Sequence, residues 1–205
     1  MAQELVQLQP GSMVDRWKVE KKLGEGGFGA VYKVSDASGQ LYALKVEGVA
    51  EQIQVLKMEV YVLTELGRRG GRHFCKIYDK GRLSTFNYVV MTFVGRSLQA
   101  RLSLFSRTFT QHDVQDLRKG STAQRFSLGT AISVGIQCLE ALEDLHGIGY
   151  LHRDVKPGNY TVGRQEQGEL RKVYVLDFGM CRKYTSNTAR ACTPPRKHLA
   201  GSDPK

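Results

Sequence analysis

The most informative segment of this sequence is His152-Arg153-Asp154-Val155-Lys156-Pro157-Gly158-Asn159. Five fixed residue types at this spacing would arise by chance in about one of ten thousand chains of average composition. Asp154 can accept the proton of an attacking hydroxyl group, and Lys156 can neutralise a phosphate in transfer. Asn159 can offer a hard oxygen ligand to magnesium. A charged turn after a helix is the alternative, but the pattern favours phosphotransfer, with Asp154 and Lys156 as catalytic residues.

A second motif, Asp177-Phe178-Gly179, begins 18 residues after Asn159 and directly follows the apolar run 173–176. This tripeptide is common and uninformative alone. In this position it predicts Asp177 as the main magnesium ligand, beside Asn159. Phe178 is then expected to pack so that it fixes the orientation of Asp177.

Upstream, the glycine-rich run is Gly24-Glu25-Gly26-Gly27-Phe28-Gly29-Ala30-Val31. Glycines at this spacing let a backbone approach phosphate oxygens that side chains would block. The pattern alone is weak, because it also suits a flexible hairpin turn. A dinucleotide-binding loop is another alternative, since the acid Glu47 follows about 20 residues later. That loop requires a helix after the glycines, whereas 30–34 has the pattern of a strand.

Lys45 ends the third predicted strand, where it could reach the phosphates of a nucleotide beneath the glycine-rich run. Glu59 lies on the apolar face of the helix that follows. A carboxylate on such a face is costly to bury unless it is paired. A lysine at the end of a strand and a glutamate on a helix are usually both exposed to solvent. The position of Lys45 and Glu59 after the glycine-rich run instead predicts an ion pair between them with a catalytic role.

The periodicity of the chain predicts a small α+β unit followed by helical and irregular structure. The first part has five strand-like runs and one helical run, and the short connections require an antiparallel arrangement. The expected strands are 16–23, 30–35, 41–46, 74–80 and 86–92, and the expected helix is 51–66. Gly81 is expected in the turn between the last two strands.

Farther along, residues 107–125 are polar and predict a long surface connection. A helix is expected at 127–146, because apolar residues recur on one face at Ile132, Ile136, Leu139, Leu142 and Leu145. The last residues are rich in Thr, Pro, Arg and Lys and have the composition of a disordered tail.

The composition of this 205-residue protein restricts its expected cellular location and its expected partners. No apolar run approaches the roughly 18 residues that a membrane span needs. The four cysteines are scattered without metal-ligand spacing, which suits reduced thiols and predicts a cytoplasmic location, with the nucleus as the alternative. The net charge is +10, half of it after Gly179, which favours acidic or phosphorylated partners. Nucleic acid fits that charge too, but no RNA-binding signature or arginine-rich helix accompanies it.

The order and spacing of these motifs resemble the protein kinases over roughly 17–196. Within that superfamily the chain is most similar to the casein kinase one group, and especially to the tau-tubulin kinase branch. The segments behind this finer resemblance are Ala43-Leu44-Lys45-Val46-Glu47, Leu56-Lys57-Met58-Glu59-Val60, Phe86-Asn87-Tyr88-Val89-Val90-Met91, Gly95-Arg96-Ser97-Leu98, Tyr150-Leu151-His152-Arg153-Asp154 and Val175-Leu176-Asp177-Phe178-Gly179.

This resemblance implies a bilobal fold and a serine/threonine kinase that uses ATP and Mg²⁺ and acts on protein substrates of acidic or pre-phosphorylated character. It places Met91 behind the adenine, with 92–94 as the hinge. Ala43 and Val31 are expected above the base and Val162 below it, although Met91 and Val162 also suit plain core packing. The implied nucleotide-binding set is Leu23, Gly24, Glu25, Gly26, Gly27, Phe28, Gly29, Val31, Ala43, Lys45, Met91 and Val162.

The resemblance also divides the chain into an N-terminal extension (1–15), an N-lobe (16–94), a partial C-lobe (95–196) and a divergent tail (197–205). Much of the helical half of a kinase C-lobe is missing from this pattern, so the helix at 127–146 is expected to keep an uncovered apolar face. A partner covering that face would resolve the conflict. The alternative function is a nucleotide-binding regulatory protein with little or no transfer activity.

Overall fold

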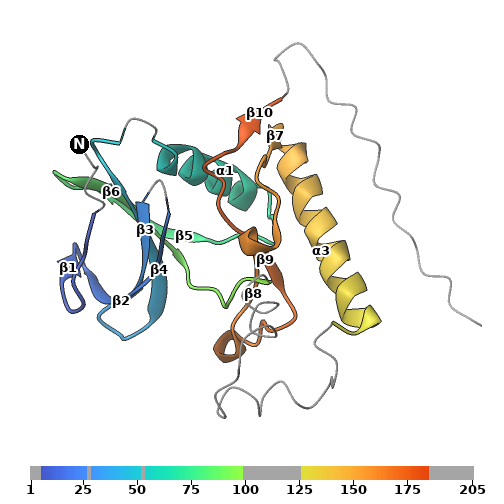
Figure 1. Cartoon of the computed structure of the whole chain (residues 1–205), viewed down its shortest axis with the longest axis horizontal. Helices are drawn as coiled ribbons and strands as arrows, with labels where there is room; N and C mark the ends of the chain where they lie inside the picture. The colour runs from blue at the N-terminus through green and yellow to red at the C-terminus, as the bar shows by residue number, and fades with distance from the viewer. Residues whose placement is uncertain (1–5, 27–28, 52–53, 99–125, 185–205) are drawn as a thin grey trace, which may run out of the picture.

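The computed structural model describes residues 6–26, 29–51, 54–98 and 126–184. Gly27, Phe28, the connection at 107–125 and the tail from residue 197 lie outside these ranges. The first half of the chain forms one antiparallel sheet with strand order β1-β2-β3-β4-β6-β5 (Figure 1). Its strands are β1 (Met13–Val14), β2 (Trp17–Gly26), β3 (Gly29–Ser35), β4 (Leu41–Gly48), β5 (Ile77–Arg82) and β6 (Phe86–Thr92).

The predicted antiparallel sheet is confirmed, and β1 adds a sixth, two-residue strand from the range assigned to an N-terminal extension. Segment 6–14 lies against the sheet, where the Tyr32 hydroxyl donates to the Val6 carbonyl and accepts from the Leu8 amide. Val14 is buried in the same core. This segment therefore covers apolar surface that β3 would otherwise expose.

Successive side chains of β4 point alternately into the core of the sheet and toward the opposite face of the sheet. Leu44 and Val46 are fully buried on the face that packs with Trp17 and Val34. The side chain between them projects to the opposite face because successive side chains in a strand alternate. Lys45 thereby faces the second half of the molecule.

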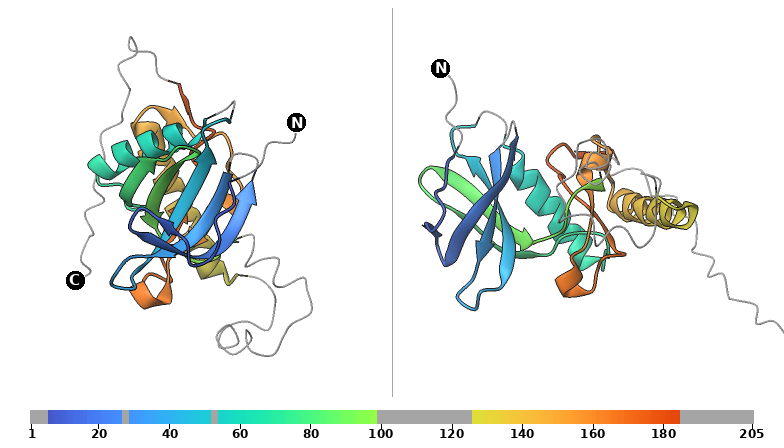
Figure 2. Two further views of the ribbon diagram at one scale, coloured as in Figure 1. Left: turned by 90° about the vertical axis from the view of Figure 1, so that its left-hand side faces the viewer. Right: turned by 60° about the horizontal axis from the view of Figure 1, so that its bottom comes forward.

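Helix α1 (Leu56–Arg68) covers that second face of the sheet, toward the rest of the molecule (Figures 1 and 2). Prediction began this helix at residue 51, but the structure begins it at Leu56. Among the apolar residues at helical spacing in this segment, Leu56 and Leu63 are buried, whereas Val60 is only half-buried. Glu59 is buried with them, so the helix brings one carboxylate to the interior.

Two details of the strand prediction were wrong. β5 begins at Ile77 and not at residue 74, because Phe74 instead bridges Val175 in the second half of the chain. Gly81 lies inside β5 opposite Tyr88, and not in the turn. A Cβ at position 81 would lie 2.6 Å from the Tyr88 ring, so this glycine admits a close ring contact.

The second half consists of one long helix, short paired strands and irregular segments. It contains α3 (Leu128–Gly147), β7 (Tyr150–Leu151), β8 (Tyr160–Val162), β9 (Val173–Val175) and β10 (Arg182–Lys183), with 3₁₀ turns at Pro157–Asn159 and Gln165–Gln167. β8 pairs with β9, and β7 pairs with β10. Ser127 caps α3 by accepting a hydrogen bond from the Thr130 amide, which explains where the helix begins.

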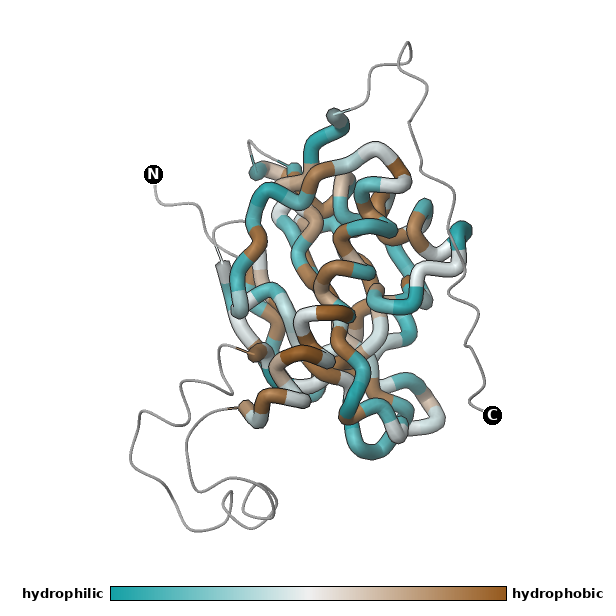
Figure 3. The backbone as a smooth tube through the Cα atoms, turned by 90° about the vertical axis from the view of Figure 1, so that its right-hand side faces the viewer, coloured by the Kyte–Doolittle hydropathy of each residue, from teal (hydrophilic) through white to brown (hydrophobic). Residues whose placement is uncertain are grey.

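The two halves share one hydrophobic core. Leu66 of α1, Leu145 of α3 and Phe178 lie in the same buried cluster. The other side of α3 faces solvent: Leu128 is 77% exposed and Leu139 is 70% exposed. Figure 3 shows apolar residues recurring along this helix. The expected uncovered face is present only in part: Ile132 and Ile136 are also exposed, whereas Leu145, which was predicted on the same face, is buried in the shared core. Among the described residues, no helix is long and apolar enough to cross a membrane.

Candidate active site

A cavity of 1010 Å³ lies between the sheet and the second half of the molecule. Its size is in the range of ordinary small-molecule sites. Most residues predicted from the motifs and from the resemblance line it, although Leu23 and Asp177 are 154 positions apart in the sequence. The predicted residues found there are Leu23, Gly24, Glu25, Gly26, Gly29, Val31, Ala43, Lys45, Glu59, Met91, Asp154, Lys156, Asn159 and Asp177.

Lys45 lies between two carboxylates at the centre of this cavity. Its Nζ donates to Glu59 Oε2 at 2.5 Å and to Asp177 Oδ1 at 3.2 Å. Burial alone would lower the pKa of Lys45, but the charges of Glu59 and Asp177 outweigh it and raise the pKa. Burial also raises the pKa of Glu59, and Lys45 opposes that effect. The predicted ion pair is present, and it joins β4, α1 and the segment after β9.

Asp154 is oriented by two neighbours from its own loop. Its Oδ2 accepts from Lys156 Nζ at 2.7 Å and from Asn159 Nδ2 at 2.9 Å. The hydrogen bond from Lys156 is the main cause that lowers the pKa of Asp154, so this carboxyl group remains an anion. Because Asn159 Nδ2 also donates to the Asp154 carbonyl, its amide is turned so that Oδ1 is the atom available to a cation.

His152 ties this loop to the segment that carries Asp177. Its Nε2 lies 3.1 Å from the Leu176 carbonyl oxygen, and its Nδ1 accepts from the Asp154 amide at 3.3 Å. These partners require the neutral tautomer protonated at Nε2, and burial lowers the pKa of His152 in agreement. The Phe178 ring packs 5.2 Å from the His152 ring. Phe178 thus has the orienting position that the sequence predicted.

Two residues of these loops have left-handed backbone angles. Arg153 has φ 65° and Asp177 has φ 64°, in a region that residues other than glycine seldom occupy. Such conformations cost about 1–3 kcal/mol and persist where surrounding contacts hold them. Here the Arg153 side chain donates to the Met180 carbonyl, and the Leu176 amide donates to the Asn159 carbonyl. These bonds connect the two strained segments to each other.

One end of the cavity is apolar. Val31, Ala43 and Met91 lie there with Leu176, and Ala43 pairs with Met91 across β4 and β6. Val162, which was expected below the base, does not line the cavity. It is buried in the core shared with Leu98 and α3, because the alternation of β8 turns it to that side.

Prediction missed several lining residues. Arg164 and Met180 line the cavity without belonging to a motif, and Leu176 was predicted only as part of the apolar run before Asp177. Their presence depends on how the β8–β9 hairpin and the segment after Asp177 fold, for which sequence spacing carries no signal. The predicted hinge 92–94 does line the cavity.

Glu47 was also missed. It is 2% exposed, and its Oε1 accepts from the Val55 amide at 2.7 Å and the Leu56 amide at 2.9 Å. Helix α1 has no side-chain cap of its own, so this carboxylate of β4 caps it from across the fold. The signal available in sequence was an acid two positions after Lys45, on the same side of the strand.

The residues fit a magnesium–nucleotide ligand. A Cβ at Gly24 or Gly26 would meet no atom within 4 Å, so the loop leaves room for a bound group there. Gly29 has φ 147°, and a Cβ there would lie 2.0 Å from the Val46 carbonyl oxygen, which makes glycine obligatory for the turn. Asp177 and Asn159 supply hard oxygen atoms, the ligands that Mg²⁺ prefers.

Comparisons with known proteins agree with this geometry. A family model described as the protein kinase domain matches residues 17–202. A Caenorhabditis elegans protein named "Putative serine/threonine-protein kinase" is 38% identical over 184 residues, covering 88% of this chain and 48% of the relative. A Dictyostelium discoideum protein named "Probable serine/threonine-protein kinase" is 34% identical over 85% of this chain and 32% of the relative. A C. elegans protein named "Putative casein kinase I" is 32% identical over 91% of this chain and 50% of the relative. The chain thus spans about half the length of these curated relatives, or less.

Proposed function

Because this chain belongs to the protein kinase family, we propose that it transfers the γ-phosphoryl group of ATP to serine and threonine hydroxyls of proteins. The observation that carries this proposal is the meeting of Lys45, Glu59 and Asp177 in one cavity with the hydrogen-bonded pair of Asp154 and Asn159. The alternative of a non-catalytic nucleotide-binding protein is not favoured, because no catalytic group expected from the motifs is missing.

The geometry supports a proposed part for each residue. The glycines of β2 and Gly29 would cover the phosphates of ATP, and Lys45 would bind them with its ammonium group held by Glu59. Asp177 and Asn159 would hold Mg²⁺, which when bound neutralises phosphate charge.

Asp154 is an anion at neutral pH and can accept a hydrogen bond from the attacking hydroxyl group, which orients that group for in-line attack. Lys156 donates to the Asp154 carboxylate, and this position supports a role for its charge in stabilising the negative charge that accumulates during transfer. A lysine at this position accords with serine and threonine as acceptors.

We further propose a casein-kinase-one-like preference, closest to the tau-tubulin kinases, for acidic or pre-phosphorylated protein substrates. The motif segments and the similarity to the protein named casein kinase I support it. A partner is proposed for the exposed face of α3, whose apolar residues have no cover among the described residues. A cytoplasmic location is proposed from the free thiols of Cys75, Cys138 and Cys181, and microscopy of a fluorescent fusion would test it.

Transfer of radiolabelled phosphate from ATP to casein tests the function directly. Asp154→Asn is expected to lower the rate by about 100- to 10,000-fold, because the anion that orients the hydroxyl group is lost. ATP binding should persist in this variant, since Asp154 lies beyond the expected phosphate contacts. Glu166→Gln is the matched control, an exposed carboxylate whose only described partner is Arg164.

Equal phosphate incorporation by the wild-type chain and Asp154→Asn would refute catalysis by this chain. ATP binding by the wild-type chain without any transfer would instead support the regulatory alternative.

A further inference from the structure

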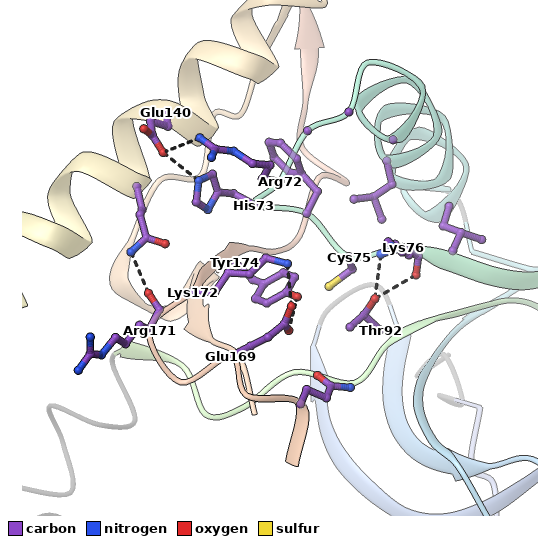
Figure 4. Close-up of a pocket in the computed structure, with 18 of the residues that line it drawn as sticks. Arg72, His73, Cys75, Lys76, Thr92, Glu140, Glu169, Arg171, Lys172 and Tyr174 are labelled. Atoms are coloured by element: carbon purple, nitrogen blue, oxygen red, sulfur yellow. Dashed lines mark hydrogen bonds and ion pairs between the residues drawn. The ribbon is translucent and has the colours of Figure 1, made fainter. Parts of the chain in front are cut away.

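A second and larger groove lies beside the active site, with a volume of 1710 Å³. It runs between the end of α1, segment 70–78, the first half of α3 and the β8–β9 hairpin (Figure 4). Lys45, Glu59, Asp154, Asn159 and Asp177 do not line it. Small-molecule sites usually measure about 300–1,000 Å³, so this groove has the size to receive a polypeptide segment.

Cations outnumber carboxylates along this groove. The cations are Arg68, Arg72, Lys76, Arg171 and Lys172, and the carboxylates are Glu140 and Glu169. Arg72 lies 3.5 Å from Glu140, and Lys172 lies 2.9 Å from Glu169, so both carboxylates already have cationic partners. His73 Nε2 also lies 3.1 Å from Glu140 Oε2. The remaining positive charge is therefore available to a ligand.

Lys76 and Arg171 carry that excess charge. Both side chains are exposed, and neither forms an ion pair with any residue that the structure describes. Figure 4 shows Lys76 near Thr92 and Arg171 extending away from the other labelled residues at the opposite side of the groove. A ligand that meets both must be extended and negatively charged along its length.

The same groove has an apolar wall. Ile132 and Ile136 of α3 are each 53% exposed, and Tyr78 of β5, which also lines the groove, is 49% exposed. An apolar side chain of a ligand would bury this surface, which contributes about 25 cal/mol per Å² removed from water. Charge and apolar surface together match a peptide that combines acidic residues with an apolar anchor.

Nucleic acid fits the groove less well. Binding of single strands relies on exposed aromatic rings on which bases stack. Phe74 and Tyr174 are buried here, which leaves Tyr78 as the one exposed ring among the described residues that line the groove, and it packs edge-on against Tyr42 with ring centroids 4.8 Å apart. A second copy of this chain would bring a formal charge of +10 to a positive groove.

We propose that this groove binds an extended acidic segment of a partner protein that carries apolar anchor residues. The site is separate from the catalytic residues, and the binding does not depend on phosphotransfer.

Fluorescence anisotropy with a fluorescein-labelled dodecapeptide repeating Glu-Glu-Leu tests this proposal. The charge reversal Lys76→Glu/Arg171→Glu is expected to weaken binding about tenfold or more, because two attractive contacts become repulsive. The matched control is Lys18→Glu/Arg82→Glu, which makes the same change in net charge at exposed positions of β2 and β5. This control is expected to stay within about twofold of the wild-type affinity, since its sites lie outside the groove.

Two further peptides test whether binding requires apolar side chains and negative charge. A dodecapeptide repeating Glu-Glu-Gly should bind several-fold more weakly than the Glu-Glu-Leu peptide, and one repeating Lys-Lys-Leu should not bind. Equal weakening by the two double variants would overturn the proposal, because it would indicate attraction to the whole surface. Equal affinity for the leucine and glycine peptides would also contradict it. So would displacement of the peptide by oligo(dT) that binds more tightly and is itself sensitive to Lys76→Glu/Arg171→Glu.

Discussion

His152 shows how a single protonation state supports the active-site loops. It accepts from the Asp154 amide at Nδ1 and lies against the Leu176 carbonyl at Nε2, so a second ring proton would break the first contact. The buried position lowers its pKa below the ordinary value of 6.5. The unfolded chain therefore binds this proton more readily than the folded chain.

This asymmetry predicts how stability depends on pH. Between pH 6.5 and the lowered pKa of folded His152, the unfolded state holds more protons, so the free energy of unfolding rises with pH. The contribution is fully present above pH 6.5 and is lost as pH falls, with a slope of at most about 1.4 kcal/mol per pH unit. Urea unfolding at several pH values should show a shallower slope for His152→Gln, whose amide can still donate to Leu176. Parallel pH profiles for the wild-type chain and the variant would contradict this account.

The ion pair of Lys45 and Glu59 is a second residue-scale feature, and it was predictable from sequence. A carboxylate on the apolar face of a helix needs a partner, and a lysine at the end of the preceding strand supplies one. The position of Val162 was not predictable in the same way. The resemblance to the kinases placed it near the nucleotide, but which side of a three-residue strand faces the cavity depends on the packing of α3 against β8.

At the scale of helices and strands, the start of α1 depends on hydrogen bonds to a residue of another element. Its first turn has no side-chain cap of its own, and Glu47 of β4 accepts two of its amides from a buried position. Since Lys45 is two residues away on the same strand, β4 fixes both the start of α1 and the charge that Glu59 meets. The orientation of α1 toward the active site thus rests on one strand.

Removal of this cap should be costly. Glu47→Ala is expected to lower the free energy of unfolding by about 2–3 kcal/mol, because two buried amides lose their acceptor. Glu47→Gln keeps an acceptor oxygen and should cost less. Urea unfolding would measure both, with the exposed Glu166→Ala expected within about 0.5 kcal/mol of wild type. A Glu47→Ala variant as stable as Glu166→Ala would show that α1 is positioned by other contacts.

The sequence predicted the bounds of helices and strands well where the hydrophobic periodicity extends over many residues. The predictions were wrong where contacts with distant segments determine the structure of an element. β6 agrees with its predicted range, and α3 begins where Ser127 can cap it. In β2, irregular register on both sides of Lys22 interrupts the predicted alternation, so Leu23 is exposed toward the cavity while Val19 is buried. Bulges of this kind depend on the partner strand, and a single strand's pattern does not reveal them.

At the scale of the whole molecule, the two halves share a buried cluster that includes Leu66, Leu145 and Phe178, and the active-site cavity lies between them. Phe178 touches both His152 and Phe74, so the segment bearing Asp177 is packed against residues of each half. The groove proposed for acidic peptides shares a wall with this cavity, since Cys75 and Thr92 line both. Neither the groove nor the shared wall could be predicted from motifs, because they arise from residues that only the fold brings together.

The central claim is that both halves contribute to a single magnesium–nucleotide site, and titration of ATP with and without Mg²⁺ measures it most directly. Isothermal calorimetry of the wild-type chain should show ATP binding that Mg²⁺ strengthens by about tenfold or more, because Asp177 and Asn159 offer oxygen ligands beside the phosphates. Asp177→Asn should retain ATP binding through Lys45 and lose most of that magnesium dependence. Absence of ATP binding by the wild-type chain, or the same magnesium dependence in both proteins, would contradict the account.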